Sequence, residues 1–189
     1  MEFRKLSIPG LVLIKPDVFG DSRGFFKETY NEEKFKENGI DIKWVQSNYS
    51  RSTKGVLRGL HWQKEPFAQD KLVRVATGRV LDVAVDIRVG SPTFGQYEAV
   101  ELSDENHNIF LVPKGFAHGF LVLSESADFE YQVSAPYNKE SERALNWKDT
   151  DTNIDWKLEG EQPLLSEKDK LNPFLKDIDP EELFKFVHQ

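Results

Sequence analysis

The sequence predicts an all-β protein, a double-sheeted barrel or a jelly roll, with a few short peripheral helices. Runs rich in β-branched and aromatic residues recur at short intervals between turn residues, a rhythm typical of all-β chains. Alternation is clearest over residues 80–87, VLDVAVDI, where every second residue is large and apolar, as in a half-buried strand. Over residues 110–123 apolar residues fall on both faces around PKG at 113–115, which predicts a hairpin enclosed between two sheets. Two packed sheets of this kind make a barrel or jelly roll.

Seven runs account for the predicted strands. They combine β-branched and aromatic residues, turn residues separate most of them, and Gly78 with Arg79 turns the chain inside the longest run. In chain order the runs cover residues 11–16, 43–50, 55–63, 71–90, 96–103, 108–124 and 128–134.

Two short helices are predicted outside the strand-rich middle. In NEEKFKENG, Asn31 is the expected N-cap, glutamates occupy the first turn and Gly39 follows the end. In DPEELFKF, the helix is expected to start after Asp179 with Pro180 at its first position. Residues 137–172 are polar and have no clean period, so they predict a long ordered loop region.

Length and composition limit the class of protein. The 189 residues suit one domain, so residues 1–189 are expected to form a single unit with an N-terminal strand arm and a short C-terminal helix. The formal charge of -7 argues against nucleic acid or an anionic membrane surface as a partner, but it permits a locally basic pocket. The absence of cysteine excludes thiolate chemistry, and no apolar run approaches the roughly 20 residues of a membrane span. We expect a soluble cytoplasmic protein.

The stretch LRGLHWQ, residues 57–63, places ionisable groups inside an apolar strand. On a regular strand His61 and Arg58 lie on opposite faces, so each face mixes apolar and polar side chains. His118 in GFAHGFLVL also lies in an apolar strand beside a glycine, where a ligand can approach closely. Because unpaired ionisable groups are costly to bury, these residues are either paired in the core or line a wet cavity.

Two further ionisable side chains on predicted strands favour the cavity. Tyr131 points to the inner face of its strand, and Lys71 opens another strand, where it is either edge decoration or part of the pocket. A core seldom buries so many ionisable groups. The other two histidines, His107 in a turn and His188 near the end of the chain, are expected to be ordinary surface residues.

A metal site is an alternative use of the two strand histidines. Barrels of this size often bind a metal through a His-x-His pair, but the residue two positions after His61 is Gln63. At most His61, His118 and an oxygen ligand could gather, which is a poor set for zinc or iron. We therefore expect no metal.

Seven motifs in one order resemble the dTDP-4-dehydrorhamnose 3,5-epimerase family. The resemblance runs from about residue 8 to residue 170 and implies a cupin-type jelly-roll barrel, also called a double-stranded β-helix. The motifs are DSRGFFKE at 21–28, VQSN at 45–48, LRGLHWQ at 57–63, KLVRV with GRVLDVAVDIR at 71–88, PKGFAHGF at 113–120, EYQVSAPYNKESE at 130–142 and LSEKD at 165–169.

The resemblance implies a role for each matching residue. The catalytic positions match His61 as general base, Tyr131 as proton donor, Asp169 as the carboxylate that orients the base, and Lys71 near the sugar's 4-keto oxygen. The substrate contacts match Arg23, Glu28, Gln46, Asn48, Arg58, His118, Tyr137, Glu142 and Lys168. A carboxylate on the far ring nitrogen fixes the tautomer of an imidazole base, and a nearby cation stabilises an enolate.

The implied reaction is epimerisation at carbons 3 and 5 of dTDP-4-dehydro-6-deoxy-D-glucose, giving dTDP-4-dehydro-L-rhamnose without a metal or any cofactor. Arg58 and His61 can share one pocket only if the strand is irregular, so we predict a bulge or twist at Gly59. The resemblance also implies a homodimer with exchanged N-terminal strands, in which Arg23 or Glu28 completes the neighbour's site.

Several alternatives remain open. A related enzyme could invert only carbon 3 or carbon 5, or could move a ketone between carbons 3 and 4. A non-catalytic sugar-nucleotide-binding cupin would bind without turnover, and His61 substitution would then weaken binding only. A metal-dependent cupin oxygenase or isomerase would carry stoichiometric metal. Isotope exchange at the two carbons and metal analysis of the purified protein separate these alternatives.

Overall fold

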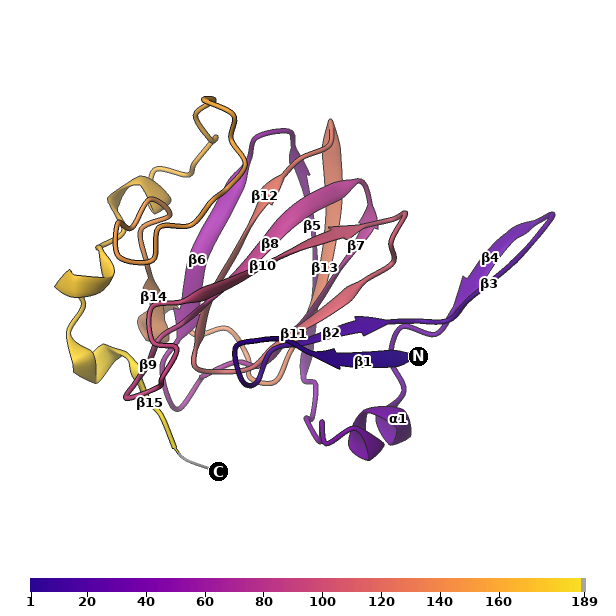
Figure 1. Ribbon diagram of the computed structural model, residues 1–189, viewed down its shortest axis with the longest axis horizontal. Helices are drawn as coiled ribbons and strands as arrows, with labels where there is room; N and C mark the ends of the chain where they lie inside the picture. Colours follow the sequence, from indigo (N-terminus) through magenta and orange to yellow (C-terminus); the bar gives the residue numbers. More distant parts are fainter. Residues whose placement is uncertain (188–189) are drawn as a thin grey trace.

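Two antiparallel sheets dominate the computed structural model, which describes residues 1–187 (Figure 1). The six-stranded sheet has the spatial order β1 (Glu2–Lys5), β2 (Val12–Lys15), β11 (Ile109–Val112), β7 (Lys71–Thr77), β13 (Ser126–Val133) and β5 (Gln46–Thr53). The five-stranded sheet has the order β10 (Tyr97–Ser103), β8 (Arg79–Asp86), β12 (Phe116–Val122), β6 (Leu57–Gln63) and β14 (Glu142–Ala144).

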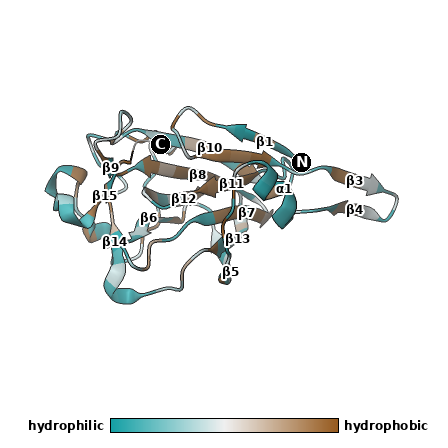
Figure 2. Cartoon of the chain, turned by 90° about the horizontal axis from the view of Figure 1, so that it is seen from below, coloured by the Kyte–Doolittle hydropathy of each residue, from teal (hydrophilic) through white to brown (hydrophobic). Residues whose placement is uncertain are grey.

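Apolar side chains from both sheets fill the space between them. One buried cluster joins Val73 and Phe129 of the six-stranded sheet to Val80 and Phe120 of the five-stranded sheet. The rings of Phe120 and Phe129 stack across this space with their centroids 4.1 Å apart. Figure 2 shows the hydrophobic strands stacked through the middle of the molecule. The predicted fold class, a cupin-type jelly-roll barrel, is confirmed.

The strand β8 is buried on both faces, so the prediction of a half-buried strand is wrong. Its faces alternate as predicted, but every residue after Arg79 is buried. The reason is that Leu81 and Val83 pack against Trp156 and Leu175 of the C-terminal region, which covers the outer face of the five-stranded sheet. The inner face of β8 lies inside the barrel.

The predicted hairpin over residues 110–123 is also wrong. β11 pairs with β2 and β7 in the six-stranded sheet, whereas β12 pairs with β6 and β8 in the five-stranded sheet. Residues 113–115 therefore carry the chain from one sheet to the other. Both strands are apolar on both faces because each lies in the interior of its own sheet.

One predicted helix forms and the other does not. The helix α1 (Glu32–Glu37) has Asn31 as its N-cap, and its Phe35 packs on the outer face of the six-stranded sheet. At the second position only a single 3-10 turn, η4 (Pro180–Glu182), forms after Asp179. The chain then becomes extended, because β15 (Phe184–Lys185) pairs in parallel with β9 (Arg88–Val89).

The loop region predicted over residues 137–172 is mostly irregular, with three short exceptions. These are the 3-10 turn η1 (Lys139–Ser141), the edge strand β14, and the 3-10 turn η2 (Asp169–Leu171). A further 3-10 turn, η3 (Leu175–Asp177), follows. Among residues 1–187, every helix is too short or too polar to cross a bilayer.

A hairpin that the sequence did not predict projects away from the barrel. It consists of β3 (Val18–Asp21) and β4 (Gly24–Lys27), and Figure 1 shows it extending well beyond both sheets. Its side chains include Phe19, Phe25 and Phe26, each of which is more than half exposed. The sequence lacks the alternation of apolar and polar residues that predicts a strand here, because the hairpin buries neither face within its own chain.

Candidate active site

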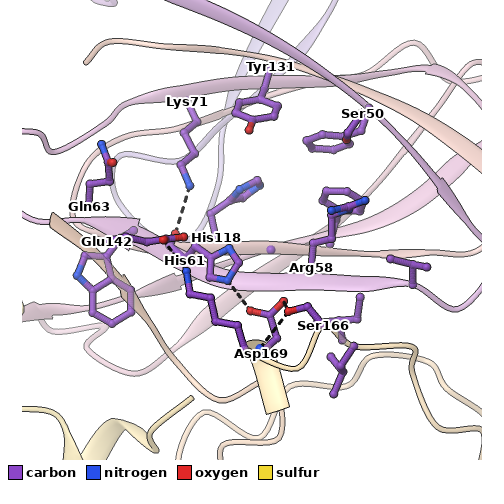
Figure 3. A pocket seen from close by; sticks show the side chains of 18 of the residues that line it. Ser50, Arg58, His61, Gln63, Lys71, His118, Tyr131, Glu142, Ser166 and Asp169 are labelled. Carbon is purple, nitrogen blue, oxygen red and sulfur yellow. Dashed lines mark hydrogen bonds and ion pairs between the residues drawn. The ribbon is translucent and has the colours of Figure 1, made fainter. Parts of the chain in front are cut away.

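A cavity of about 580 Å³ lies between the two sheets near one end of the barrel. Figure 3 shows Tyr131 and Lys71 above the cavity, His61 and Arg58 below it, and Asp169 beneath His61. The predicted site residues that line it are Arg58, His61, Lys71, His118, Tyr131, Tyr137, Glu142, Lys168 and Asp169. Residues from several separate motifs therefore meet in one place.

A bulge in β6 places Arg58 and His61 on the same side of the strand. His118 on β12 pairs with His61, and Phe120 pairs with Arg58, so β6 has one extra residue between the two pairs. Gly59 permits the distortion because its φ is +114° and a Cβ there would lie 2.7 Å from the Cα of Gly119. The irregularity predicted at Gly59 is confirmed.

His61 and Asp169 form an imidazole–carboxylate pair. Nε2 of His61 lies 2.6 Å from Oδ1 of Asp169, whose other oxygen accepts a 2.8 Å hydrogen bond from the hydroxyl of Ser166. Burial by itself raises the pKa of Asp169, but the hydrogen bonds from His61, Ser166 and Asn172 lower the pKa below its usual value. The carboxylate is therefore ionised and accepts the Nε2 proton, which leaves Nδ1 of His61 with a lone pair for proton abstraction.

Lys71 extends from β7 into the cavity. Its Nζ donates a 3.2 Å hydrogen bond to the main-chain oxygen of His61. Burial lowers the pKa of Lys71 to about 8, although the negative charges of Asp82 and Glu142 act in the opposite direction. Because water screens a buried ammonium only a little, it interacts strongly with negative charge that develops nearby. Stabilisation of an enolate oxygen needs such an interaction.

Tyr131 lies across the cavity from His61, on the other sheet. It comes from β13, and its ring packs beside Phe129 with centroids 6.0 Å apart. Burial raises the pKa of the Tyr131 hydroxyl, while the charge of Arg58 lowers it. The hydroxyl therefore stays protonated near neutral pH and can donate a proton from the wall opposite the base (Figure 3).

Charged and polar residues surround the cavity. The ammonium of Lys168 lies 2.5 Å from Oε2 of Glu142, which also accepts a 3.0 Å hydrogen bond from the hydroxyl of Tyr137. Burial by itself raises the pKa of Glu142, but Lys168 and Tyr137 lower it below the usual value. Arg58 donates a 2.9 Å hydrogen bond from Nε to Ser52, which leaves the far end of its exposed guanidinium directed at the cavity (Figure 3).

Four predicted substrate contacts lie outside the cavity. Arg23 is at the tip of the projecting hairpin and pairs with Asp21. Glu28 follows the hairpin and pairs with Lys34. Gln46 and Asn48 lie on β5, joined by a 2.8 Å hydrogen bond.

Gln46 and Asn48 lie in register with a residue that does line the cavity. They share the inward face of β5 with Ser50. These two residues therefore continue the cavity wall along the edge strand, whereas the β3–β4 hairpin projects away from the two sheets whose residues line the cavity (Figure 1).

Several cavity residues were not predicted as site residues. Gln63 and Gln69 line the cavity while donating to main-chain oxygens of Phe67 and Ala135, respectively. Ser166 was missed although its spacing from Asp169 is readable: its Oγ accepts from the main-chain N–H of Asp169 at 3.1 Å, as in a capped turn.

Of the two remaining histidines, only His107 is among the described residues, and it does not line the cavity. His107, predicted as an ordinary surface residue, is partly buried, and its Nδ1 lies 3.0 Å from Nζ of Lys27 at the base of the projecting hairpin. His188 lies outside the described residues. Within residues 1–187, no group of three or more His, Asp or Glu side chains is arranged to hold a metal ion.

Comparisons with known proteins agree with this geometry. The chain matches the sequence model of the family described as dTDP-4-dehydrorhamnose 3,5-epimerase over residues 5–177. It is 52% identical over 170 residues to a dTDP-4-dehydrorhamnose 3,5-epimerase from Shigella flexneri, a match that covers 89% of this chain and 93% of the relative.

Two crystal structures are informative. A dTDP-6-deoxy-D-glucose-3,5-epimerase from Legionella pneumophila Philadelphia 1, in complex with dTDP-4-keto-L-rhamnose, is 49% identical, with a TM-score of 0.95 and 99% of each chain covered. A 3'-monoepimerase from Streptomyces bikiniensis, in complex with dTDP-quinovose, is 34% identical, with a TM-score of 0.90, 95% of this chain covered and 91% of that chain.

Proposed function

Because the chain belongs to the dTDP-4-dehydrorhamnose 3,5-epimerase family, we propose that its cavity inverts carbons 3 and 5 of dTDP-4-dehydro-6-deoxy-D-glucose to give dTDP-4-dehydro-L-rhamnose. The observation that carries the proposal is the placement of a base and an acid on opposite walls of one cavity. His61 with Asp169 lies on one wall, and Tyr131 lies on the other. Inversion of a carbon centre needs this arrangement, because the proton leaves one face of the sugar and returns to the other.

The first step is removal of a proton beside the ketone. The 4-keto group acidifies the hydrogens on carbons 3 and 5, and Nδ1 of His61 takes the proton as an enolate forms. Asp169 stabilises the resulting imidazolium through the 2.6 Å contact to Nε2. The Lys71 ammonium stabilises the negative charge that develops on the enolate oxygen. A positioned base contributes about 10²- to 10⁴-fold to the rate.

The second step is reprotonation from the opposite face. The Tyr131 hydroxyl gives its proton to the enolate carbon, and the ketone re-forms with the centre inverted. The raised pKa of Tyr131 suits this role, because the hydroxyl is fully protonated at neutral pH. Before the second centre is inverted, His61 loses its proton to water and the Tyr131 oxygen takes one from water. Only protons move, so the reaction needs no oxidant or reductant.

Local positive charge suits the diphosphate of the substrate. The whole chain carries a formal charge of -7, yet Arg58 and Lys168 both line the cavity. Arginine in particular binds phosphate oxygens in a bidentate fashion. We assign these two residues to the diphosphate and Tyr137, which is 57% exposed beside the cavity, to stacking on the sugar or base.

We further propose a homodimer in which the projecting hairpin of one copy covers its neighbour. The hairpin exposes Phe19 at 64%, Phe25 at 59% and Phe26 at 69%, which is unusual for a two-stranded ribbon without a partner. Docking on a second copy buries these rings, and it carries Arg23 and Glu28 toward the neighbour's cavity. Each copy is a single domain, and the dimer is a cytoplasmic enzyme.

The test is proton NMR of the 4-keto sugar nucleotide with the protein in D₂O. Loss of signal at carbons 3 and 5 supports the proposal, and exchange at carbon 3 alone indicates a single-centre epimerase, the activity named for the Streptomyces bikiniensis relative. A product with its ketone at carbon 3 indicates the ketoisomerase. Binding without any exchange, in a protein whose His61→Asn variant only binds more weakly, would leave only the non-catalytic alternative.

A further inference from the structure

A second imidazole–carboxylate pair lies beneath the cavity, and the mechanism above does not use its carboxylate. His118 on β12 lines the cavity, and its Nε2 lies 2.8 Å from Oδ1 of Asp82 on β8. Asp82 is 0% exposed. Its other oxygen, Oδ2, accepts no hydrogen bond from any of the described residues. A buried carboxylate with a single partner destabilises the fold, so packing alone does not account for it.

Asp86 shows what a purely structural aspartate looks like on the same face of the same strand. It is also 0% exposed. Arg88 pairs with it at 2.7 Å, and the hydroxyls of Ser91 and Thr93 each donate a 2.6 Å hydrogen bond to Oδ2. Both oxygens of Asp86 are thus satisfied by its own loop. Asp82 has no such loop, and its charge is balanced only by groups of the cavity.

His118 and, after it, Lys71 are the cavity groups that balance Asp82. Burial raises the pKa of Asp82 above its usual value, and the charges of His118 and Lys71 offset part of that shift. Burial likewise lowers the pKa of Lys71, and Asp82 is the strongest charge acting against that effect. The other titratable or charged groups facing this part of the cavity are Arg58 and His61 from β6, Tyr131 from β13 and Glu142 from β14.

We propose that Asp82 is a positioning residue for the epimerisation: its buried carboxylate fixes the ring of His118 and is the counter-charge of Lys71 below the keto oxygen of the sugar. Asp82 does not itself touch the substrate, because it is fully buried behind His118. The inference rests on the proposed function, since it assigns Lys71 to the enolate oxygen. It adds a residue on β8 that acts only through two others.

The decisive variant is Asp82→Asn, which keeps the shape of the side chain and removes its charge. Lys71 loses its strongest counter-charge, so its ammonium should titrate about one pH unit lower than in the wild type. kcat should fall about twofold at pH 7 and about fivefold at pH 8, with little change in KM, and the basic limit of the pH profile should move to lower pH. In the Lys71→Arg background the same change should leave the pH profile where it was, because a guanidinium stays charged.

Asp86→Asn is the matched control. It removes a second fully buried carboxylate from the same face of β8, so it should lower stability without moving the pH profile. Equal profiles for Asp82→Asn and wild type, or an equal shift in Asp86→Asn, would overturn the proposal.

Two NMR readouts separate this inference from the proposed function, because neither needs turnover. The first is the titration of Lys71 in ¹³C-labelled protein, assigned with the Lys71→Arg variant. An unshifted titration in Asp82→Asn overturns the proposal even if the wild type is an active epimerase. The second readout is the ring tautomer of His118 in the wild type, which needs no variant to fold. A proton on Nε2 is expected, and its absence would contradict the role of Asp82.

Discussion

Turnover should have a basic limit near pH 8 that belongs to Lys71. Burial lowers the pKa of its ammonium to about 8, with Asp82 and Glu142 acting against the shift. Only the protonated form stabilises the enolate oxygen, so kcat should follow the protonated fraction. That fraction is about nine tenths one unit below the pKa and about one tenth one unit above it. We therefore expect kcat at pH 9 to be roughly tenfold below its value at pH 7.

Stability should change in the opposite direction over the same range. Between the folded pKa of about 8 and the ordinary value of 10.5, the unfolded chain binds more protons at Lys71 than the folded chain does. The free energy of unfolding therefore rises with pH across this window, by up to roughly 3 kcal/mol at about 1.4 kcal/mol per pKa unit. Below pH 8 the cost of burying the ammonium is present in full.

The assay is kcat by NMR or a coupled reaction from pH 6 to pH 9.5, with urea unfolding at pH 7, 8 and 9. Lys71→Arg is the control for charge, since its cation does not titrate in this range. Its kcat should be lower but should lack the limit near pH 8. In Lys71→Met the extra stability gained on raising the pH should disappear. A limit that persists unchanged in Lys71→Arg would show that another group causes it, and a flat wild-type profile would refute the assignment.

Three further predictions concern the bulge, the base and the hairpin. Gly119→Ala should destabilise the protein by about 1–3 kcal/mol in urea unfolding and reduce activity, because its methyl would lie 2.6 Å from the Arg58 carbonyl oxygen. Gly20→Ala, with its nearest atom at 3.7 Å, should be close to neutral. Ser166→Ala should lower kcat about tenfold at unchanged KM, because it removes the hydrogen bond that holds Asp169 in place. Ser166→Thr should restore much of the lost kcat. A raised KM with unchanged kcat would instead argue that Ser166 contacts the substrate. Phe26→Asp should give monomers in sedimentation velocity, whereas Val45→Asp, at a residue 49% exposed outside the hairpin, should not.

The sequence predicted the fold class because strand alternation is a local signal. The core of the site followed from motif order: His61, Lys71, Tyr131 and Asp169 come from four separate segments and meet in one cavity. What failed was the pairing of elements. Residues 110–123 were read as one hairpin, because nothing local distinguishes a turn within a sheet from a turn between two sheets.

Partner strands and covering segments account for the other errors. The segment 179–186 has a good helix start, yet its pairing with β9 makes it extended after one turn. The strand β8 was expected to face solvent on one side, but the C-terminal region covers that side. Long-range contacts override local propensity in both cases. The placement of Arg23 outside the cavity has the same origin if its partner is a second chain.

The base of the candidate site depends on a segment that is not part of the barrel. Asp169 and Ser166 belong to the C-terminal region, whereas His61 is in β6. That region is attached to the other face of the same strand, where Nε1 of Trp62 donates a 3.2 Å hydrogen bond to the main-chain oxygen of Glu182. Adjacent residues of β6 therefore carry the base on one face and an anchor of the segment on the other. We therefore expect that weakening this anchor, for example by Trp62→Phe, loosens the contact between Asp169 and His61 and lowers kcat.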